Sequence, residues 1–201
     1  MIGIINYRCG NLQNLQNALD ALGHSSKILD SPGEMAGINK FILPGVGAFG
    51  HAAQNLKDFG FWEPLKEVVA AGTPVLGICV GMQLLFSKSF EEGEHEGLGL
   101  IEGEVVRFSH DLKVPHMGWN RVILHQPEDP LFEGIGEHNW FYFVHSYACY
   151  PEDKAFLLGG GFYGHEFCAA TRRGNLWGVQ FHPEKSQEDG LKLLDNFVKK
   201  V

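Results

Sequence analysis

Residues 73–86 read Thr-Pro-Val-Leu-Gly-Ile-Cys-Val-Gly-Met-Gln-Leu-Leu-Phe, and they decide the fold that the sequence predicts. The apolar run at 75–78 has the length of a buried parallel strand, and residues 82–86 continue with good helix formers. Cys79 therefore falls at a strand-to-helix turn. The pattern Gly-x-Cys-x-Gly is the thiol counterpart of the nucleophile elbow, in which a strained turn exposes one reactive side chain. The alternative is that Cys79 is buried and packs as a small apolar side chain, which is the commoner role of a cysteine.

A cysteine nucleophile needs a base to take its proton and a third group to orient that base. Residues 175–181 have the apolar pattern of a final core strand, and His182-Pro183-Glu184 follows directly. Pro183 disfavours helix at His182, so His182 and Glu184, two residues apart, can lie on the same side. Because the thiol and the imidazole both follow central strands, we expect them at the same edge of an α/β sheet. Cys79, His182 and Glu184 are therefore the candidate catalytic residues.

Composition narrows the class of protein. The 201 residues suit one domain, covering 1–201, and 44% hydrophobic with 20% charged residues is typical of a globular chain. A net charge of −8 without clustered Lys and Arg argues against nucleic acid as a partner. There is no apolar run of membrane-spanning length and no basic leader, so we expect a cytoplasmic protein with no membrane partner. The four cysteines lack a zinc-ligand spacing, and we expect no metal ion and no cofactor.

The order of elements predicts an α/β fold. Strand-like and helix-like segments alternate in the first half, which is typical of parallel β-α-β units. The expected strands there are 2–5, 25–29, 40–43 and 75–78, and the expected helices are 11–22, a short one from 31–32, and 59–71. Residues 87–99 have the polar, Gly-rich composition of a loop. Strands dominate afterwards, at 101–108, 122–124, 140–147, 155–162, 167–172 and 176–181, before a last helix at 188–201.

The two catalytic motifs, in their order and separation, resemble those of the class I (triad) glutamine amidotransferases. Residues 41–49, Phe-Ile-Leu-Pro-Gly-Val-Gly-Ala-Phe, look like the oxyanion strand of that family. Residues 1–12, 114–120 and 141–147 narrow the resemblance to the glutaminase subunits of imidazole glycerol phosphate synthase, and Pro-His-Met-Gly-Trp-Asn within 114–120 is the most specific match. This resemblance implies a single-domain class I fold, with antiparallel hairpins of the second half layered on the same mostly parallel sheet.

The resemblance also implies roles for residues outside the triad. The amides of Val46 and Val80 would form the oxyanion hole, and glycines on both sides of Val46 give that peptide the freedom to turn. The residues implied in glutamine binding are Gly47, Gln83, Glu91, Ser146 and Tyr147. Those implied in the interface with a partner are Asn11, Trp119, Asn120 and Lys185. We expect Trp119 to lie in a Gly-interrupted loop and to anchor the interface, because aromatic residues often dominate interface energies.

The implied activity is hydrolysis of L-glutamine to glutamate and ammonia. The ammonia would pass to a cyclase subunit with a (β/α)8 barrel, forming a heterodimer that makes imidazole glycerol phosphate and aminoimidazole carboxamide ribotide in histidine biosynthesis. One alternative is a paralogous subunit that supplies ammonia to a synthase amidating a surface sugar. Arg8 and Cys9 keep it open, because they depart from the usual residues of a loop that faces the partner in relatives. The other alternative is a catalytically inactive binding module, against which the intact triad and Gln83 argue.

Overall fold

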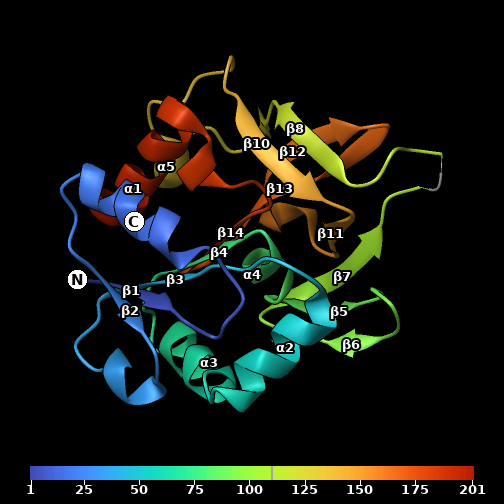
Figure 1. Cartoon of the computed structure of the whole chain (residues 1–201). Helices are drawn as coiled ribbons and strands as arrows, with labels where there is room; N and C mark the ends of the chain where they lie inside the picture. The colour runs from blue at the N-terminus through green and yellow to red at the C-terminus, as the bar shows by residue number, and fades with distance from the viewer. Residues whose placement is uncertain (110) are drawn as a thin grey trace.

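The computed structural model describes residues 1–109 and 111–201, and a mixed sheet of twelve strands runs through its centre (Figure 1). The strands of its parallel half are, in spatial order, β2 (Ser26–Leu29), β1 (Ile2–Ile5), β3 (Lys40–Leu43), β4 (Val75–Ile78) and β14 (Leu176–Val179). Every residue of β1, β4 and β14 is buried. Their continuous apolar runs therefore follow from helices covering both faces of this half.

The second half of the sheet is mostly antiparallel. From β14 outward it contains β13 (His165–Arg173), β11 (Tyr147–Pro151), β7 (Ile101–Arg107), β5 (Phe86–Ser89) and β6 (His95–Glu96). Strand β12 (Leu157–Tyr163) pairs with β13 and with β9 (Ile123–Leu124). Strands β8 (His116–Asn120) and β10 (Phe141–His145) form a separate antiparallel pair. The expected antiparallel strands on a shared sheet are thus confirmed, except that β8 and β10 lie outside that sheet.

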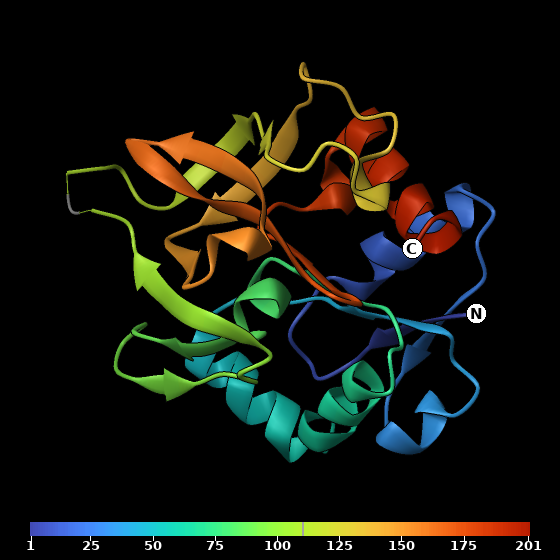
Figure 2. The same cartoon turned by 180° about the vertical axis from the view of Figure 1, so that it is seen from behind.

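Helices cover both faces of the parallel half, as Figures 1 and 2 show from opposite sides. Helices α1 (Leu12–Ala21) and α5 (Gln187–Lys199) lie on one face, and α2 (Phe49–Asp58) and α3 (Trp62–Ala70) lie on the other. Helices α1 and α5 each present an apolar stripe at helical spacing, such as Leu15, Ala18 and Leu19 on α1. The remaining helix is the four-residue α4 (Val80–Gln83), and single 3₁₀ turns lie at Pro32–Met35, Pro130–Phe132, Lys154–Phe156 and Pro183–Lys185.

The helix expected at 59–71 starts too early in the prediction, because residues 59–61 form the turn between two helices. Helix α2 ends at Asp58, Gly60 turns the chain with a φ of 76°, and α3 starts only at Trp62. Helix α2 was not among the expected elements, and Gly50 lies in its first turn. A Cβ there would come within 2.7 Å of the His95 ring, so packing selects this glycine.

The nucleophile helix is also shorter than the sequence predicts. Residues 82–86 were expected to continue it, but α4 ends at Gln83 and Phe86 already begins β5. The loop expected at 87–99 likewise contains most of the β5–β6 hairpin. Good helix formers give way here because β5 gains a partner in β7, and tertiary pairing outweighs local propensity.

Two further expectations fail in the second half. Trp119 lies in strand β8 rather than in a loop, and the strand expected at 140–147 divides at Ser146 into β10 and β11, which belong to different sheets. Pro115 and Gly118 are unfavourable in strands, so β8 was not predicted. Its exposed Met117 and Trp119 nevertheless alternate with more buried neighbours.

Candidate active site

Cys79 lies at the expected strand-to-helix turn, between β4 and α4. Its backbone φ of 56° and ψ of −113° are sparsely populated for a residue with a side chain, which costs about 1–3 kcal/mol. The Cys79 amide donates a 2.8 Å hydrogen bond to the Val179 carbonyl, fixing the turn to β14. The flanking glycines allow close packing, because a Cβ on Gly77 would lie 2.8 Å from the backbone of α4 and one on Gly81 would overlap the Leu43 carbonyl.

His182 comes from the adjacent parallel strand β14, three residues after its end. Its Nδ1 lies 2.9 Å from Glu184 Oε1, and both side chains are almost completely buried. The His182 amide donates to the Tyr142 carbonyl at 2.9 Å, and the Ser186 hydroxyl donates to the His182 carbonyl at 2.6 Å. Two hydrogen bonds therefore hold the backbone of His182, and Glu184 holds its imidazole ring.

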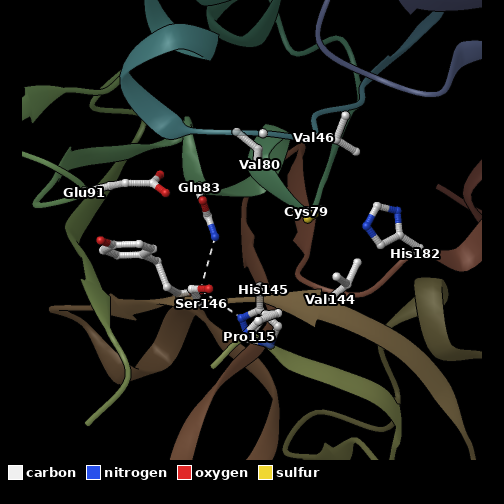
Figure 3. Close-up of a pocket in the computed structure, with 12 residues that line it drawn as sticks. Val46, Cys79, Val80, Gln83, Glu91, Pro115, Val144, His145, Ser146 and His182 are labelled. Carbon is white, nitrogen blue, oxygen red and sulfur yellow. Dashed lines mark hydrogen bonds between the residues drawn. The ribbon is translucent and has the colours of Figure 1, made fainter. Parts of the chain in front are cut away.

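The electrostatics favour a charged imidazole. Burial lowers the pKa of His182, but the Cys79 sulfur and the Glu184 carboxylate outweigh burial and raise this pKa from 6.5 to about 10. His182 Nε2 is buried and has no hydrogen-bond partner among the described residues. Figure 3 shows Cys79 and the His182 ring lining the same end of a pocket. The free nitrogen is thus available to the chemistry of that pocket.

The pocket has a volume of about 270 Å³. Nine of the ten residues predicted for catalysis, the oxyanion hole and glutamine binding line it, namely Val46, Gly47, Cys79, Val80, Gln83, Glu91, Ser146, Tyr147 and His182. The tenth, Glu184, contacts His182 from outside this pocket and lines a smaller hollow with Asn11. Pro115, Val144 and His145 complete the lining, and the sequence analysis gave them no role in the pocket.

The oxyanion candidates come from two neighbouring segments. Val80 is the first residue of α4, whose earliest amides have no intrahelical acceptor. Val46 follows β3 and is 42% exposed. Before it, the buried Tyr7 hydroxyl donates to the Pro44 carbonyl at 2.6 Å, and a Cβ on Gly45 would approach the Gly81 amide nitrogen at 2.5 Å. Gly45 is therefore fixed by packing, whereas Gly47, with a φ of 98° and nothing near its Cβ position, provides the backbone freedom.

Polar residues fix the far end of the pocket. Glu91 is partly buried, which is the main cause of its raised pKa, and its Oε2 accepts from the Phe49 amide at 2.6 Å. In Figure 3, Glu91 lies at one end of the pocket and His182 at the other, with Cys79 toward the His182 end. The pocket thus has a carboxyl group at one end and a thiol with an imidazole toward the other.

Gln180 is a site residue that the sequence reasoning missed. It is fully buried on the chain between β14 and His182, and its Nε2 lies 3.7 Å from Cys79 Sγ. Its Oε1 accepts from Gln83 Nε2 at 3.1 Å, and that same nitrogen donates to the Tyr147 carbonyl at 3.2 Å. A glutamine inside an otherwise apolar strand, two residues before the candidate base, was the available signal.

The four candidate interface residues do not share one environment. Trp119 is 44% exposed on β8, packed edge-on against Tyr142, and Lys185 is exposed on the turn after His182. Asn11 is exposed and caps α1 by accepting from the Asn14 amide at 3.3 Å. The side chain of Asn120 is instead used inside the protein, where it contacts His116 and the Phe162 carbonyl.

Two negative findings apply to the described residues. None of their helices combines the length and apolar character needed to cross a membrane. Within the same residues, no three His, Cys, Asp or Glu side chains are grouped so that they could hold a metal ion. Cys149 and Cys168 are buried on paired strands.

Comparison with known proteins places the chain in a family. The family model described as glutamine amidotransferase class-I matches residues 4–201. The imidazole glycerol phosphate synthase subunit HisH of Sulfurimonas denitrificans is 50% identical, over 99% of this chain and 98% of that protein. The subunit HisH of Desulfitobacterium hafniense is 52% identical, over 100% of this chain and 95% of its own length.

Solved structures agree on the fold. A crystal structure of glutamine amidotransferase has a TM-score of 0.76 with 19% identity, covering 98% of both chains. The structure of PurLQS from Thermotoga maritima has a TM-score of 0.78 with 17% identity, covering 98% of this chain and 96% of that one. The chain therefore belongs to the class-I glutamine amidotransferase family and groups within it with the imidazole glycerol phosphate synthase subunits named HisH.

Proposed function

We propose that this chain hydrolyses L-glutamine to glutamate and ammonia as the glutaminase subunit of imidazole glycerol phosphate synthase. The observation that carries the proposal is the meeting of Cys79 and His182 in one pocket, with Glu184 Oε1 2.9 Å from His182 Nδ1. Relatives named for this subunit, about half identical over nearly the whole chain, support the same activity.

The proposed reaction proceeds through a thioester. The Cys79 thiolate attacks the side-chain amide carbon of glutamine, a carbon–sulfur bond forms, and the carbonyl electrons move onto oxygen. The amides of Val46 and Val80 stabilise that oxyanion. When the carbon–nitrogen bond breaks, the imidazolium of His182 gives its proton to the departing nitrogen, which leaves as ammonia.

The second half of the reaction restores the enzyme. Water attacks the thioester carbon, His182 takes a proton from that water, and the carbon–sulfur bond breaks to release glutamate and the thiolate. Glu184 holds the imidazole through Nδ1, so that Nε2 carries both proton transfers. The raised pKa of His182 supports its role as the acid in the first step.

The substrate orientation follows from the two ends of the pocket. We assign Glu91 to the α-amino group of glutamine, because a partly buried carboxylate there offers a charge partner for a cation. Gln83 lines the wall between Glu91 and Cys79 as a further substrate contact, and the backbone of Ser146 and Tyr147 would contact the α-carboxylate. Gly47 lines the same wall near Val46.

The partner in this proposal is a cyclase subunit with a (β/α)8 barrel, bound as a heterodimer in the cytoplasm. Ammonia released into water would be protonated and lost, so a glutaminase of this kind needs a second protein seated over its pocket. Asn11, Trp119 and Lys185 are assigned to that contact, together with Met117, which is 63% exposed beside Trp119 on β8. Asn120, expected there from the sequence, is not assigned to it, because its side chain is hydrogen-bonded to His116 and to the Phe162 carbonyl. Aromatic and Met side chains of this kind are enriched in interfaces.

The geometry at Arg8 and Cys9 bears on the alternative of a surface-sugar synthase. Only Arg8 is exposed, with its guanidinium 5.8 Å from the centre of the Phe59 ring. Cys9 is buried, where its sulfur accepts from Asn55 at 3.3 Å. The surface change in this loop is thus one residue, which supports the histidine-pathway partner.

The proposal is tested by measuring glutamate release by the chain alone, with the histidine-pathway cyclase subunit, and with that subunit and its ribotide ligand. We expect hydrolysis with the cyclase, increased by the ribotide. Absence of hydrolysis in all three mixtures, together with failure of a diazo-ketone glutamine analogue to label Cys79, would leave the inactive binding module as the better reading.

A further inference from the structure

We propose that Asn120, His116 and His145 form a directional hydrogen-bond relay that positions the backbone of Tyr147 in the pocket wall. Its role toward glutamine rests on the proposed function, but its existence and direction do not. These three side chains have no part in the chemical steps described above. The relay begins on strand β8 and ends at a residue of the pocket.

The contacts form an unbroken chain through the protein. Asn120 Nδ2 lies 3.2 Å from His116 Nε2, and His116 Nδ1 lies 3.0 Å from His145 Nε2. His145 Nδ1 lies 2.8 Å from the Tyr147 carbonyl oxygen. Both imidazoles are thus bonded through both ring nitrogens, as structural side chains are and as a free catalytic base is not.

The two ends of the chain independently fix its direction. Asn120 Nδ2 also faces the Phe162 carbonyl at 3.0 Å, and Asn120 Oδ1 accepts from the Arg121 amide at 2.8 Å, so the amide has only one satisfactory orientation. It must therefore donate to His116. A neutral His116 then carries its proton on Nδ1 and donates to His145, which in turn donates through Nδ1 to the Tyr147 carbonyl. That carbonyl requires a donor, so both ends demand the same tautomers.

Burial keeps the two imidazoles neutral. It lowers the pKa of His116 to about 4 and that of His145 to about 3. The His116 ring stacks on Tyr163 with centroids 4.4 Å apart, and the His145 ring packs 5.1 Å from both Phe108 and Phe167. Protonation of either ring would also set two N–H donors face to face within the chain, which the relay geometry opposes.

The relay acts at the same atom as a substrate-binding candidate. The Tyr147 carbonyl accepts from His145 on one side and from Gln83 Nε2, at 3.2 Å, on the other, and Figure 3 draws both hydrogen bonds as dashed lines. Two donors fix the orientation of this carbonyl, and with it the backbone that lines the pocket. Asn120, His116 and His145 are therefore positioning residues.

The direction is tested by nitrogen-15 NMR of the histidine rings in the full chain at pH 7, with signals assigned by single His→Gln variants. We expect His116 and His145 to be neutral and protonated on Nδ1, without any substrate present. A ring protonated on Nε2 alone at either position overturns the relay, whatever the enzymatic activity. The tautomers are read from the wild-type spectrum, and the variants serve only to assign its signals.

The positioning role is tested by Asn120→Asp, which keeps the shape but replaces the donor by an acceptor. His116 must then donate from Nε2, so the tautomers of both histidines reverse and the Tyr147 carbonyl faces an unprotonated Nδ1. One lost hydrogen bond predicts a KM for glutamine about five- to tenfold higher, with a smaller change in kcat, in the complex with the cyclase. Asn17→Asp on the exposed face of α1 is the matched control, since Asn17 Oδ1 only accepts there, from Gln13 at 2.9 Å.

The outcomes separate the two proposals. The positioning role would be refuted if Asn120→Asp had the same tautomers and the same KM as the wild type, while Asn17→Asp also behaved as the wild type. A wild-type complex that does not hydrolyse glutamine, while its histidines show the expected tautomers, would refute the proposed function and leave the relay in place.

Discussion

Replacement of Gly81 by Ala tests how closely the elbow packs against strand β3. Gly81 does not have a positive φ, so alanine is compatible with its backbone conformation. However, the new Cβ would overlap the Leu43 carbonyl oxygen and lie 2.8 Å from the Leu43 carbonyl carbon. Ordinary van der Waals contact begins at 3.4 Å, so the carbonyl carbon alone would require α4 and the end of β3 to separate by 0.6 Å, and the overlapping oxygen requires a larger movement.

The expected cost has a structural and a catalytic part. Overpacking of this kind lowers the free energy of unfolding by about 1–3 kcal/mol. Leu43 lies three residues before Val46, and Gly81 is next to Val80, so the separation also moves the two proposed oxyanion donors apart. Loss of one such donor lowers kcat by about a hundred- to a thousandfold. We therefore expect a folded but nearly inactive variant.

The assay combines urea unfolding of the chain with glutamate release in the cyclase complex. Gly136→Ala is the control, because a Cβ there meets nothing within 4 Å and the backbone strain of a positive φ is absent. We expect the control to change the free energy of unfolding by less than about 0.5 kcal/mol and to retain activity. If Gly81→Ala kept its stability and more than a fifth of the wild-type activity, the close approach of α4 and β3 would limit neither stability nor the placement of the oxyanion donors.

Three further outcomes follow from the site. Glu184→Gln removes a charge that raises the His182 pKa. The alkaline limb of the pH profile of glutaminase activity should therefore shift to lower pH. Because that pKa is raised, the stabilisation is complete below about pH 6.5 and is lost as pH rises through about 10. The stability difference between wild type and variant, measured by denaturant titration, should therefore shrink from pH 7 to 10, and a constant difference would contradict the assignment. Trp119→Ala and Lys185→Ala should weaken cyclase binding in calorimetry, by about 2 kcal/mol or more for the tryptophan if it is the anchor, and unchanged affinity with unchanged coupling would exclude both. The isolated chain should hydrolyse glutamine about a hundredfold more slowly than the liganded complex if the Val46 amide points away at rest, whereas equal rates would leave no switch at Gly47.

The parallel half of the fold was predictable because its sequence signals are local and agree with one another. The apolar run of β4, the glycines beside Cys79 and the His182-Pro183-Glu184 turn each specify one geometry. Parallel strands then bring the ends of β4 and β14 to the same edge, so the pocket residues could be placed without knowing any distance.

The parts that were missed depend on partners distant in sequence. Helix α2 was hidden by Gly50, which is glycine because of the His95 ring rather than because of a loop. Strand β8 exists through its pairing with β10, more than twenty residues away. Gln180 gains its importance from its contact with Cys79, 101 residues away, and His145 from its contact with His116, 29 residues away. A glutamine in an apolar run marked Gln180 as unusual but did not identify its partner.

The role of Cys79 is tested by the Cys79→Ala variant in complex with the cyclase subunit, assayed for product with glutamine and with ammonium salt at alkaline pH. We expect no glutamine-dependent product and a nearly normal rate with ammonium salt, because the thiol serves only glutamine hydrolysis and the partner uses free ammonia. A variant that retained a tenth or more of the glutamine-dependent rate would show that Cys79 is not the nucleophile.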